Sequence, residues 1–196
     1  MEKMLICLKD LAEKMGPASL EQNIDEVIAS LELFLDKQTF CQRRFNKVKV
    51  DEYDDEEENS EGGDSEDLDH DELILGNTTD VIIAISAAFG DSFLPYLQRL
   101  GPKIAKYMED DHGKSDKIMA IGCFGEVLHN CPSAAAAPYF EPFMQILIKH
   151  SGTEDGSMNH NVAYGFGVLA ERASVELFSP HLNTAMTCVK NMHAAS

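Results

Sequence analysis

Glu126 and His129 have a spacing that can do metal chemistry, because residues three apart on a helix project from one face. Such Glu-x-x-His pairs hold iron in helical bundle proteins, but those sites use two pairs together with further carboxylates. This sequence has a single pair, and Asn130 and Cys131 after it are expected to end the helix. A histidine near a helix C-terminus is already favoured by the helix dipole. We therefore interpret the pair as structural and predict no metal site.

Other reactive residues do not form a recognisable catalytic arrangement. The sequence has no Gly-rich phosphate loop, no G-x-S-x-G elbow and no H-E-x-x-H, and its 7 histidines are scattered. The 5 cysteines are odd in number, widely spaced and without a C-x-x-C pair, which is typical of unpaired thiols in a reducing compartment. Cys7 and Cys123 lie among apolar residues, so we expect both in the core. The sequence predicts neither an enzyme nor a bound cofactor.

Carboxylates are the most numerous charged groups. The 196 residues include 34 Asp and Glu against 16 Lys and Arg, a formal net charge of −18. The stretch 51–72 alone holds 14 of these acidic residues and no Lys or Arg, so the rest of the chain is nearly neutral. This balance argues against nucleic-acid binding, which needs clustered Lys and Arg. The charge balance does not by itself identify a partner.

The hydrophobic pattern predicts helices throughout. Apolar residues recur at spacings of three and four, and few stretches alternate as strands do. The longest strongly apolar run, Val81–Phe89, is about half the roughly 20 residues that cross a bilayer, so we expect no membrane span. Short breaks with Gly, Pro, Asp or Ser separate the segments. The predicted helices lie near residues 2–15, 19–37, 72–89, 92–109, 115–130, 134–149, 157–172 and 175–192.

The predicted helices repeat along the chain. Pro95, Pro138 and Pro180 each fall near the start of the second helix of a pair, at spacings of 43 and 42 residues. Ala120–Gly122 recurs as Ala163–Gly165 after 43 residues. A helical hairpin with a period of about 40–47 residues is the signature of HEAT and armadillo repeats. We predict an all-α HEAT-repeat α-solenoid, with about four antiparallel helix pairs stacked in a right-handed superhelix.

Four expected repeats and one insert follow from this period. The repeats span 1–37, 72–109, 114–150 and 156–193. Residues 38–71 break the period and contain most of the acidic block, so we predict a charged, flexible insert that cannot bury enough apolar surface to fold. Inside the predicted helices, a close helix–helix contact would explain four glycines: Gly122, Gly125, Gly165 and Gly167.

Four motifs occur in an order that is specific to one family. Asp80–Ile82 reads D-V-I, and Phe93–Tyr96 reads F-L-P-Y. Ile118–Val127 fits A-I-G-x-x-x-E, and Asn161–Leu169 is similar to N-A-x-[FY]-G-x-G-x-L. Together they resemble the importin-β (karyopherin-β) nuclear transport receptors, and most closely the branch that carries ribosomal proteins and histones. The resemblance extends over residues 1–193.

Two features depart from the family pattern. Met158–His160 stand where the family has a basic or Asn position before the last motif. The predicted repeats are also far fewer than in the receptors, and the arch that binds the GTPase Ran in that family has no counterpart here. The resemblance therefore implies either a fragment from the middle of a receptor or a short divergent relative.

The resemblance also implies partners and a location. In the family, basic cargo and Ran lie against the concave side, which the second helices line, and Phe-Gly nucleoporins insert between convex first helices. Receptors of this kind shuttle between cytoplasm and nucleus through the nuclear pore. By this analogy we expect carboxylates to bind basic cargo such as ribosomal proteins and histones. The candidate residues are Glu21, Asp25, Glu26 and Glu32 in the first repeat and Asp54, Asp55, Glu56, Glu57 and Glu58 in the insert.

Other interpretations of the same residues remain open. The helical carboxylates also fit a solvated helix face, and the acidic block also fits a solubilising loop or a mimic of cargo that competes from inside the arch. The array as a whole also fits a HEAT-repeat scaffold or a histone-chaperone-like protein-interaction module without transport activity. Composition does not separate these from a transport receptor.

Overall fold

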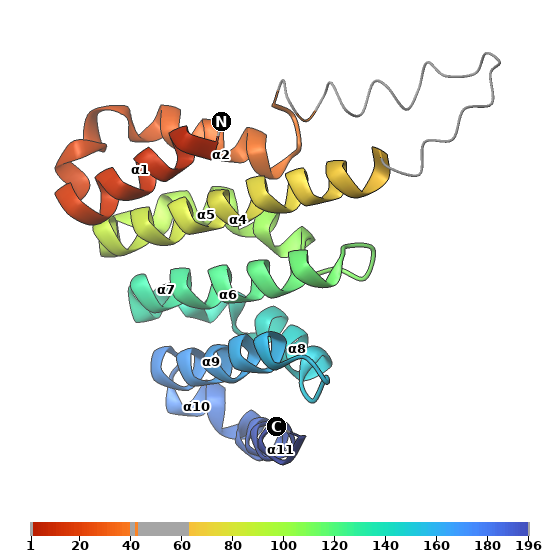
Figure 1. Cartoon of the computed structure of the whole chain (residues 1–196). Coiled ribbons are helices and arrows are strands. Elements are labelled where there is room, and N and C mark those ends of the chain that lie inside the picture. The colour runs from red at the N-terminus through yellow and green to blue at the C-terminus, as the bar shows by residue number, and fades with distance from the viewer. Residues whose placement is uncertain (1, 40–41, 43–62, 196) are drawn as a thin grey trace, which may run out of the picture.

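The computed structural model describes residues 2–39, 42 and 63–195. These residues fold into helices, turns and short connections, with no strand among them. The helices are arranged in successive pairs from the N-terminal to the C-terminal end of an elongated stack (Figure 1). This arrangement confirms the predicted all-α HEAT-repeat α-solenoid.

The first helices of the pairs are long and mostly regular, whereas the second helices are preceded by short turns. The helices are α1 (Glu2–Met15), α2 (Ile24–Leu35), α4 (Gly63–Phe89), α5 (Leu94–Lys106), α6 (Lys114–Asn130), α7 (Ser133–Ala136), α8 (Phe140–His150), α9 (Gly156–Arg172), α10 (Val175–Phe178) and α11 (Leu182–Ala195). The 3₁₀ turns are Pro17–Ser19, Glu21–Asn23, Gly90–Phe93, Ala137–Tyr139 and Ser179–His181.

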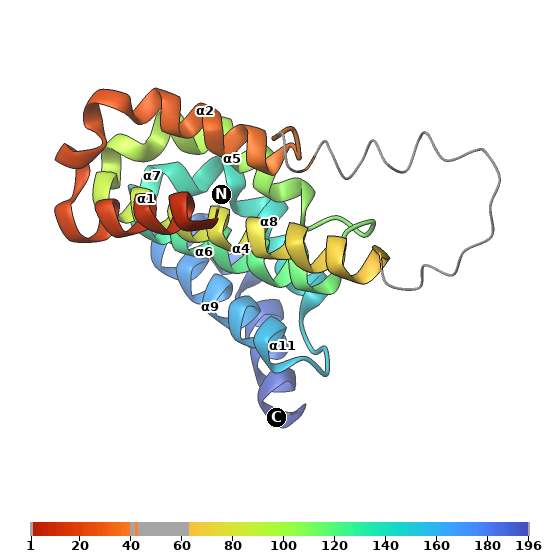
Figure 2. The same ribbon diagram turned by 45° about the horizontal axis from the view of Figure 1, so that its top comes forward.

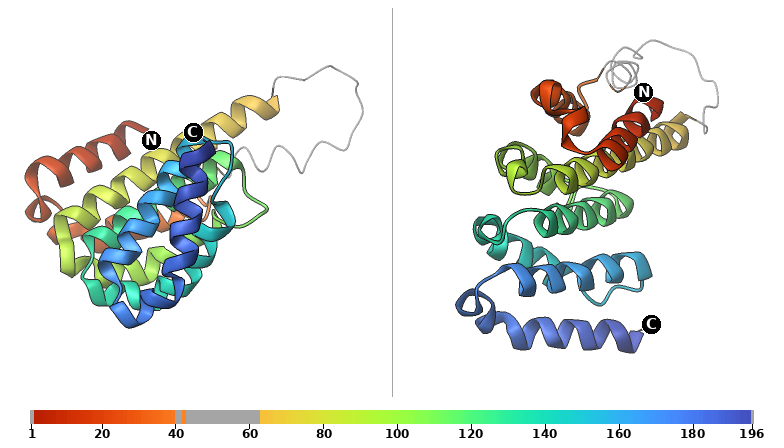
Figure 3. Two further views of the ribbon diagram at one scale, coloured as in Figure 1. Left: turned by 90° about the horizontal axis from the view of Figure 1, so that it is seen from below. Right: turned by 90° about the vertical axis from the view of Figure 1, so that its left-hand side faces the viewer.

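The stack has two layers. α1, α4, α6 and α9 lie one above another and contact their neighbours, forming what we call the first-helix layer (Figure 3, right). The second helices form the other layer, in which α2 packs against α5 and α8 packs against α11. Figure 2 shows α2 and α5 side by side at the N-terminal end. Each pair therefore contacts mainly the next pair, as expected for a solenoid.

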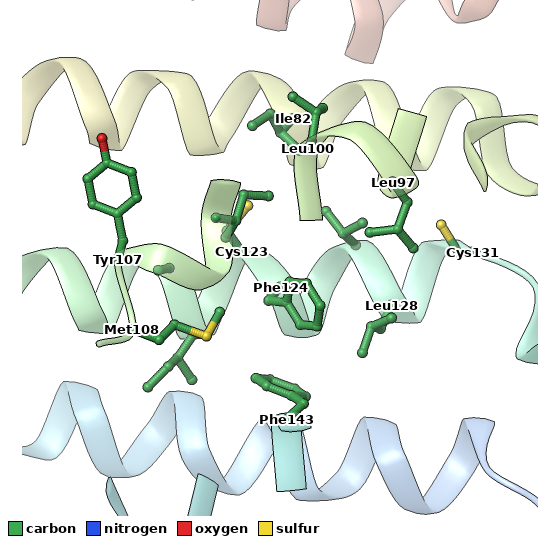
Figure 4. Packing of buried hydrophobic residues seen from close by; sticks show 14 of the residues in the cluster. Ile82, Leu97, Leu100, Tyr107, Met108, Cys123, Phe124, Leu128, Cys131 and Phe143 are labelled. Atoms are coloured by element: carbon green, nitrogen blue, oxygen red, sulfur yellow. The ribbon is translucent and has the colours of Figure 1, made fainter. Parts of the chain in front are cut away.

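The hydrophobic core continues from one repeat to the next. On α5, Leu97, Leu100 and Ile104 recur at helical spacing and are buried between the layers. Phe124 of α6 points toward Phe143 of α8, with ring centroids 5.0 Å apart in an edge-on arrangement (Figure 4). Burying such a side chain contributes about 1.5–3 kcal/mol, so the repeats stabilise one another.

The second helices of the pairs are each divided, which the sequence did not predict. Segments expected as single helices at 19–37, 92–109, 134–149 and 175–192 begin with one or two short turns before the main helix. Pro138 and Pro180 lie inside such turns, and Pro95 lies in the first turn of α5. Proline has no N–H and disfavours the α conformation in the preceding residue, so the chain bends there before the main helix starts.

The expected start of the second repeat at residue 72 is wrong. α4 begins at Gly63, nine residues earlier, so the part of the predicted insert from 63 to 71 is helical. Helix extension adds a hydrogen bond for each residue once a packed segment has nucleated the helix. The acidic composition continues to Glu72 without a change at Gly63, so composition alone does not reveal where the helix begins. The predictions for residues 40, 41 and 43–62 lie outside the described residues.

Two single-residue predictions also need correction. Cys7 is exposed, because α1 directs Leu5 and Ala12 into the core and Cys7 lies off that face; Cys123 is buried as predicted. Among the helical glycines, a Cβ on Gly122, Gly125 or Gly165 would meet a neighbouring helix, but a Cβ on Gly167 would have no described atom within 4 Å. The close-contact explanation is confirmed for the first three glycines and wrong for Gly167.

The segment His70–Lys106 contains one 18-residue window apolar enough for a membrane span, with a mean hydropathy of 1.6. Half of that window is buried inside the protein, and the turn at Gly90–Phe93 separates α4 from α5 within the segment. Its hydropathy is therefore accounted for by packing in the helical core.

Candidate protein-binding surface

The helical candidates gather at α2 in the second-helix layer. Glu21 lies in the turn before α2, and Asp25, Glu26 and Glu32 lie on α2 itself. The other five candidates, Asp54, Asp55, Glu56, Glu57 and Glu58, lie outside the described residues. The structure therefore places four of the nine predicted residues along α2 and the turn before it.

Hydrophobic periodicity fixes which side of α2 carries the carboxylates. Ile24, Ile28, Leu31 and Leu35 are buried and hold the helix on the core. The carboxylates occupy the remaining positions around the helix, and Glu21, Asp25 and Glu26 are exposed whereas Glu32 is half-buried. The carboxylates therefore face away from the core because the apolar residues of α2 pack against it.

Glu32 is paired within the protein. The Nη2 atom of Arg99 on α5 lies 2.7 Å from Oε2 of Glu32, and its Nε donates to Oε1 at 3.4 Å. Arg99 Nη1 also lies 3.5 Å from Oδ1 of Asp25. The hydrogen bond to Glu32 raises the pKa of Arg99, which stays protonated. Arg99 therefore holds one candidate carboxylate closely and a second one loosely.

Two more contacts extend this link between the first two repeats. Lys103 of α5 pairs with Asp36 just after α2. The Tyr107 hydroxyl donates a 2.6 Å hydrogen bond to the carbonyl oxygen of Leu35. We call the four charged residues Glu32, Asp36, Arg99 and Lys103 the inter-repeat ion-pair row. Sequence reasoning missed three of them, although Arg99, Lys103 and Tyr107 stand four apart and so share one helix face.

Glu21 and Glu26 differ from Glu32. Both are exposed, and neither forms an ion pair with any residue that the structure describes. Asp25 contacts Arg99 only at 3.5 Å, and 81% of its side chain remains exposed. These three carboxylates are therefore accessible to an external cation.

The first-helix layer also carries an open surface pocket between α4 and α6, which we call the α4–α6 groove. It is a cavity of about 630 Å³ with apolar walls from Leu73, Ile83 and Met119. Gly76 lies in the groove, and the Sδ atom of Met119 is 3.3 Å from where a Gly76 Cβ would be. The remaining lining residues are polar: Glu72, Asn77, Thr79, Asp80 and Ser115. The groove is open, largely apolar and bordered by polar groups.

The reactive side chains show no activated arrangement in the described part of the chain. No three His, Cys, Asp or Glu residues there are grouped as metal ligands. His129 instead lies 3.5 Å from Glu171. Burial raises the pKa of the Cys131 thiol to about 11, which disfavours the nucleophilic thiolate. The chemistry offered by these surfaces is recognition of charged and apolar side chains.

Comparisons with known proteins agree with this architecture. The family model described as importin repeat 6 matches residues 1–110, which is more than half of the chain. A probable importin subunit beta-4 from Schizosaccharomyces pombe (strain 972 / ATCC 24843) is 30% identical over 118 residues. That match covers 60% of this chain but 11% of the yeast protein, so the chain spans a small part of the relative's length. The chain belongs to the importin repeat 6 family, as an array of HEAT repeats of the importin-β type.

Proposed function

We propose that this array contributes to nuclear import by binding basic protein cargo, such as ribosomal proteins and histones, in a Ran-regulated transport cycle. The family membership supports a transport role. The observation that carries the cargo class is the set of accessible carboxylates at α2, because Glu21 and Glu26 are exposed without a described ion-pair partner. The full cycle, with shuttling between cytoplasm and nucleus, would require Ran and nucleoporins acting on the whole receptor.

Electrostatics gives these carboxylates a defined role. Opposite charges within about 8 Å attract at physiological ionic strength, and more distant exposed charges are screened. Charge complementarity mainly raises association rates and specificity, and it contributes less to affinity. A Lys- and Arg-rich cargo segment lying along α2 would meet Glu21, Asp25 and Glu26 in succession.

The acidic block is proposed to raise the rate at which basic cargo arrives. The Nζ atom of Lys37, which follows α2, lies 3.2 Å from Oδ2 of Asp71 on α4, so the described residues on either side of 43–62 come close together near the C-terminal end of α2. The block's carboxylates Asp54, Asp55, Glu56, Glu57 and Glu58 would add to the negative field around α2. The competing proposal is that the block mimics cargo. In that case, neutralising the block should make cargo binding faster or tighter.

The α4–α6 groove is proposed to accept the phenyl ring of a Phe-Gly nucleoporin segment. Its size and apolar walls suit an aromatic side chain, and the Met119 sulfur offers a favourable sulfur–aromatic contact. It lies in the first-helix layer, away from the α2 carboxylates. Cargo and nucleoporin would therefore bind without competing for the same residues.

The cargo proposal is tested with a fluorescent Lys- and Arg-rich histone-tail peptide and fluorescence anisotropy at low and physiological salt. Glu21→Gln combined with Glu26→Gln should weaken binding about three- to tenfold, as expected for losing two exposed charge contacts. Glu2→Gln combined with Glu13→Gln is the matched control, because it removes the same charge from α1 in the other layer. Equal affinity of both double variants would contradict the proposal.

The acidic block is tested by changing its five candidate residues to Asn or Gln without altering chain length. Stopped-flow mixing with the same peptide should give slower association at low salt and little change in dissociation. Faster or tighter binding would instead support the cargo-mimic interpretation. An unchanged association rate would leave the solubilising loop as the explanation of the block.

The groove is tested with a Phe-Gly peptide and NMR chemical-shift mapping. Leu73→Ala and Met119→Ala should weaken binding, whereas Leu33→Ala, which removes a similarly exposed leucine from α2, should not. If no Phe-Gly binding is found while histone binding persists, the HEAT-repeat scaffold or histone-chaperone-like alternative is favoured over a transport role.

A further inference from the structure

Two basic residues of α5 contact carboxylates beside those that the proposed function assigns to cargo, and Asp25 belongs to both sets. Arg99 contacts Glu32 and Asp25, and Lys103 contacts Asp36. We propose that Arg99 and Lys103 are built-in competitors that occupy the carboxylates of α2 and are displaced by a basic cargo segment. This inference rests on the proposed function, because it concerns regulation of the same surface.

The contacts can be displaced because they are partly solvated. The side chains of Arg99 and Glu32 are 38% and 21% exposed, and those of Lys103 and Asp36 are 24% and 23% exposed. Because each pair is partly exposed to solvent, an incoming cation can reach its carboxylate. The Tyr107 hydrogen bond to Leu35 and the buried contacts of α5 remain after displacement. The two repeats thus stay joined while the carboxylates change partners.

The geometry selects the incoming side chain. Arg99 approaches Glu32 through two nitrogen atoms, Nη2 at 2.7 Å and Nε at 3.4 Å. An arginine from cargo can reproduce this two-point contact, whereas a lysine offers a single ammonium group. The carboxylate vacated by Arg99 should therefore favour arginine over lysine.

The spacing of the carboxylates selects the register of the cargo. Asp25 and Glu32 are seven residues apart on α2, which places their backbone positions about 10 Å apart along the helix axis. A peptide in the polyproline II conformation advances about 3.1 Å per residue with three residues per turn, so basic residues at positions i and i+3 share a face and span nearly the same length. A cargo segment of the form R-x-x-R would thus replace both contacts of Arg99 at once.

The experiment compares single charge removals on α5. Arg99→Met keeps the aliphatic stem and removes the guanidinium, which frees Glu32 and Asp25. Binding of an R-x-x-R peptide should become about three- to tenfold tighter at low salt, because one internal competitor is lost. Lys106→Met is the matched control, since Lys106 is exposed on the same helix and forms no ion pair with a described residue. It should change the affinity less than Arg99→Met does.

Two further measurements make the result decisive. Arg99→Lys keeps the charge but loses the two-point contact, so its affinity for the peptide should lie between wild type and Arg99→Met. The increase in affinity caused by Arg99→Met should also be smaller for a K-x-x-K peptide than for an R-x-x-R peptide. Unchanged or weaker binding by Arg99→Met, or an equal gain in Lys106→Met, overturns the inference. Thermal unfolding followed by circular dichroism verifies that each variant is folded; if Arg99→Met is not, Arg99→Lys decides by the same comparison.

Failure of this inference differs from failure of the proposed function. If wild type binds the peptide and Glu21→Gln with Glu26→Gln weakens it, the cargo surface stands whatever Arg99→Met does. If wild type does not bind, or the Glu21 and Glu26 double variant has no effect, the proposed function itself is wrong. The two outcomes are separated within one set of titrations.

Discussion

The side-chain amide of Asn161 donates a 2.8 Å hydrogen bond to the carbonyl oxygen of Ile118, 43 residues earlier. This contact joins α9 to α6 at equivalent positions of successive repeats. It requires close approach, because a Cβ on Gly122 would lie 2.7 Å from the Asn161 nitrogen. The glycine inside α6 thus makes room for a polar contact between repeats. A similar contact joins α6 to α4, where the Asn130 amide donates to the Ser86 hydroxyl at 2.9 Å.

We predict that Gly122→Ala and Asn161→Ala are coupled. Gly122→Ala should lower the free energy of unfolding by about 1–3 kcal/mol, because the new methyl group collides with the amide. Asn161→Ala should cost about 1 kcal/mol through the lost hydrogen bond. In the double variant the collision is absent and alanine improves helix propensity, so the combined loss should be clearly below the sum. Denaturant unfolding of the four proteins measures this cycle, and simple additivity would contradict the assigned contact.

Gly165 and Gly167 should respond in opposite directions to the same substitution. A Cβ on Gly165 would lie 2.7 Å from Leu147 Cδ2, inside the α8–α9 contact, so Gly165→Ala should destabilise by about 1–3 kcal/mol. Gly167 is exposed, and a Cβ there would have no described atom within 4 Å. Gly167→Ala should therefore stabilise α9 by up to about 1 kcal/mol. Thermal unfolding of the two variants is the measurement, and shifts of equal sign would refute the packing assignment.

Tyr107→Phe should cost about 1 kcal/mol at neutral pH, because the Leu35 carbonyl loses its side-chain donor. Burial raises the pKa of Tyr107 above its ordinary value of 10.0. The folded state therefore keeps the proton where the unfolded chain loses it, and the stability from this group is lost as pH rises above 10. The stability gap between wild type and Tyr107→Phe should narrow above that pH.

The control for this pH dependence is Tyr96→Phe on the same helix. The Tyr96 hydroxyl makes no hydrogen bond with a described residue, so this substitution should cost less at neutral pH. Urea unfolding at pH 7, 9 and 10.5 supplies the comparison. A gap for Tyr107→Phe that stays constant across these pH values would show that burial does not disfavour its ionised form.

Asp155 should make the start of α9 sensitive to acid. Its carboxylate accepts a 2.9 Å hydrogen bond from the Met158 N–H and lies 2.6 Å from Lys114. The hydrogen bond from Lys114, followed by that from Met158, lowers the pKa of Asp155 below 3.8. A lowered pKa means that the stability is present above 3.8 and is lost as pH falls through the folded-state value.

Two substitutions separate the cap from the charge. Asp155→Asn can still cap the helix but cannot pair with Lys114, so its melting temperature at pH 7 should lie between those of wild type and Asp155→Ala. Wild type and Asp155→Asn should converge as the pH is lowered below 3.8. Parallel melting curves for the two proteins at all pH values would argue against a contribution from the charge.

Helical repeats are the part of this protein that the sequence determines by itself. Apolar spacing and turn residues act locally, so the helix pairs and their period of 42 to 43 residues could be predicted from positions such as Pro95, Pro138 and Pro180. The same local signals placed the α2 carboxylates on a helix beside an acidic block. They did not reveal that α4 starts at Gly63, because the expected boundary was drawn from composition and helix extension depends on the packed segment that follows.

Which residues contact one another depends on the packing of the helices. Gly165 and Gly167 look alike in the sequence, yet one faces Leu147 and the other faces solvent. Glu26 and Glu32 are both acidic residues of α2. Arg99 lies 67 residues after Glu32 in the sequence, and of these two residues it contacts only Glu32. Such differences depend on how far each helix is rotated against its neighbour, which the whole core sets at once. Local residue patterns therefore suffice to predict the repeats and the charged helix, whereas helix packing sets which carboxylates remain available to a partner.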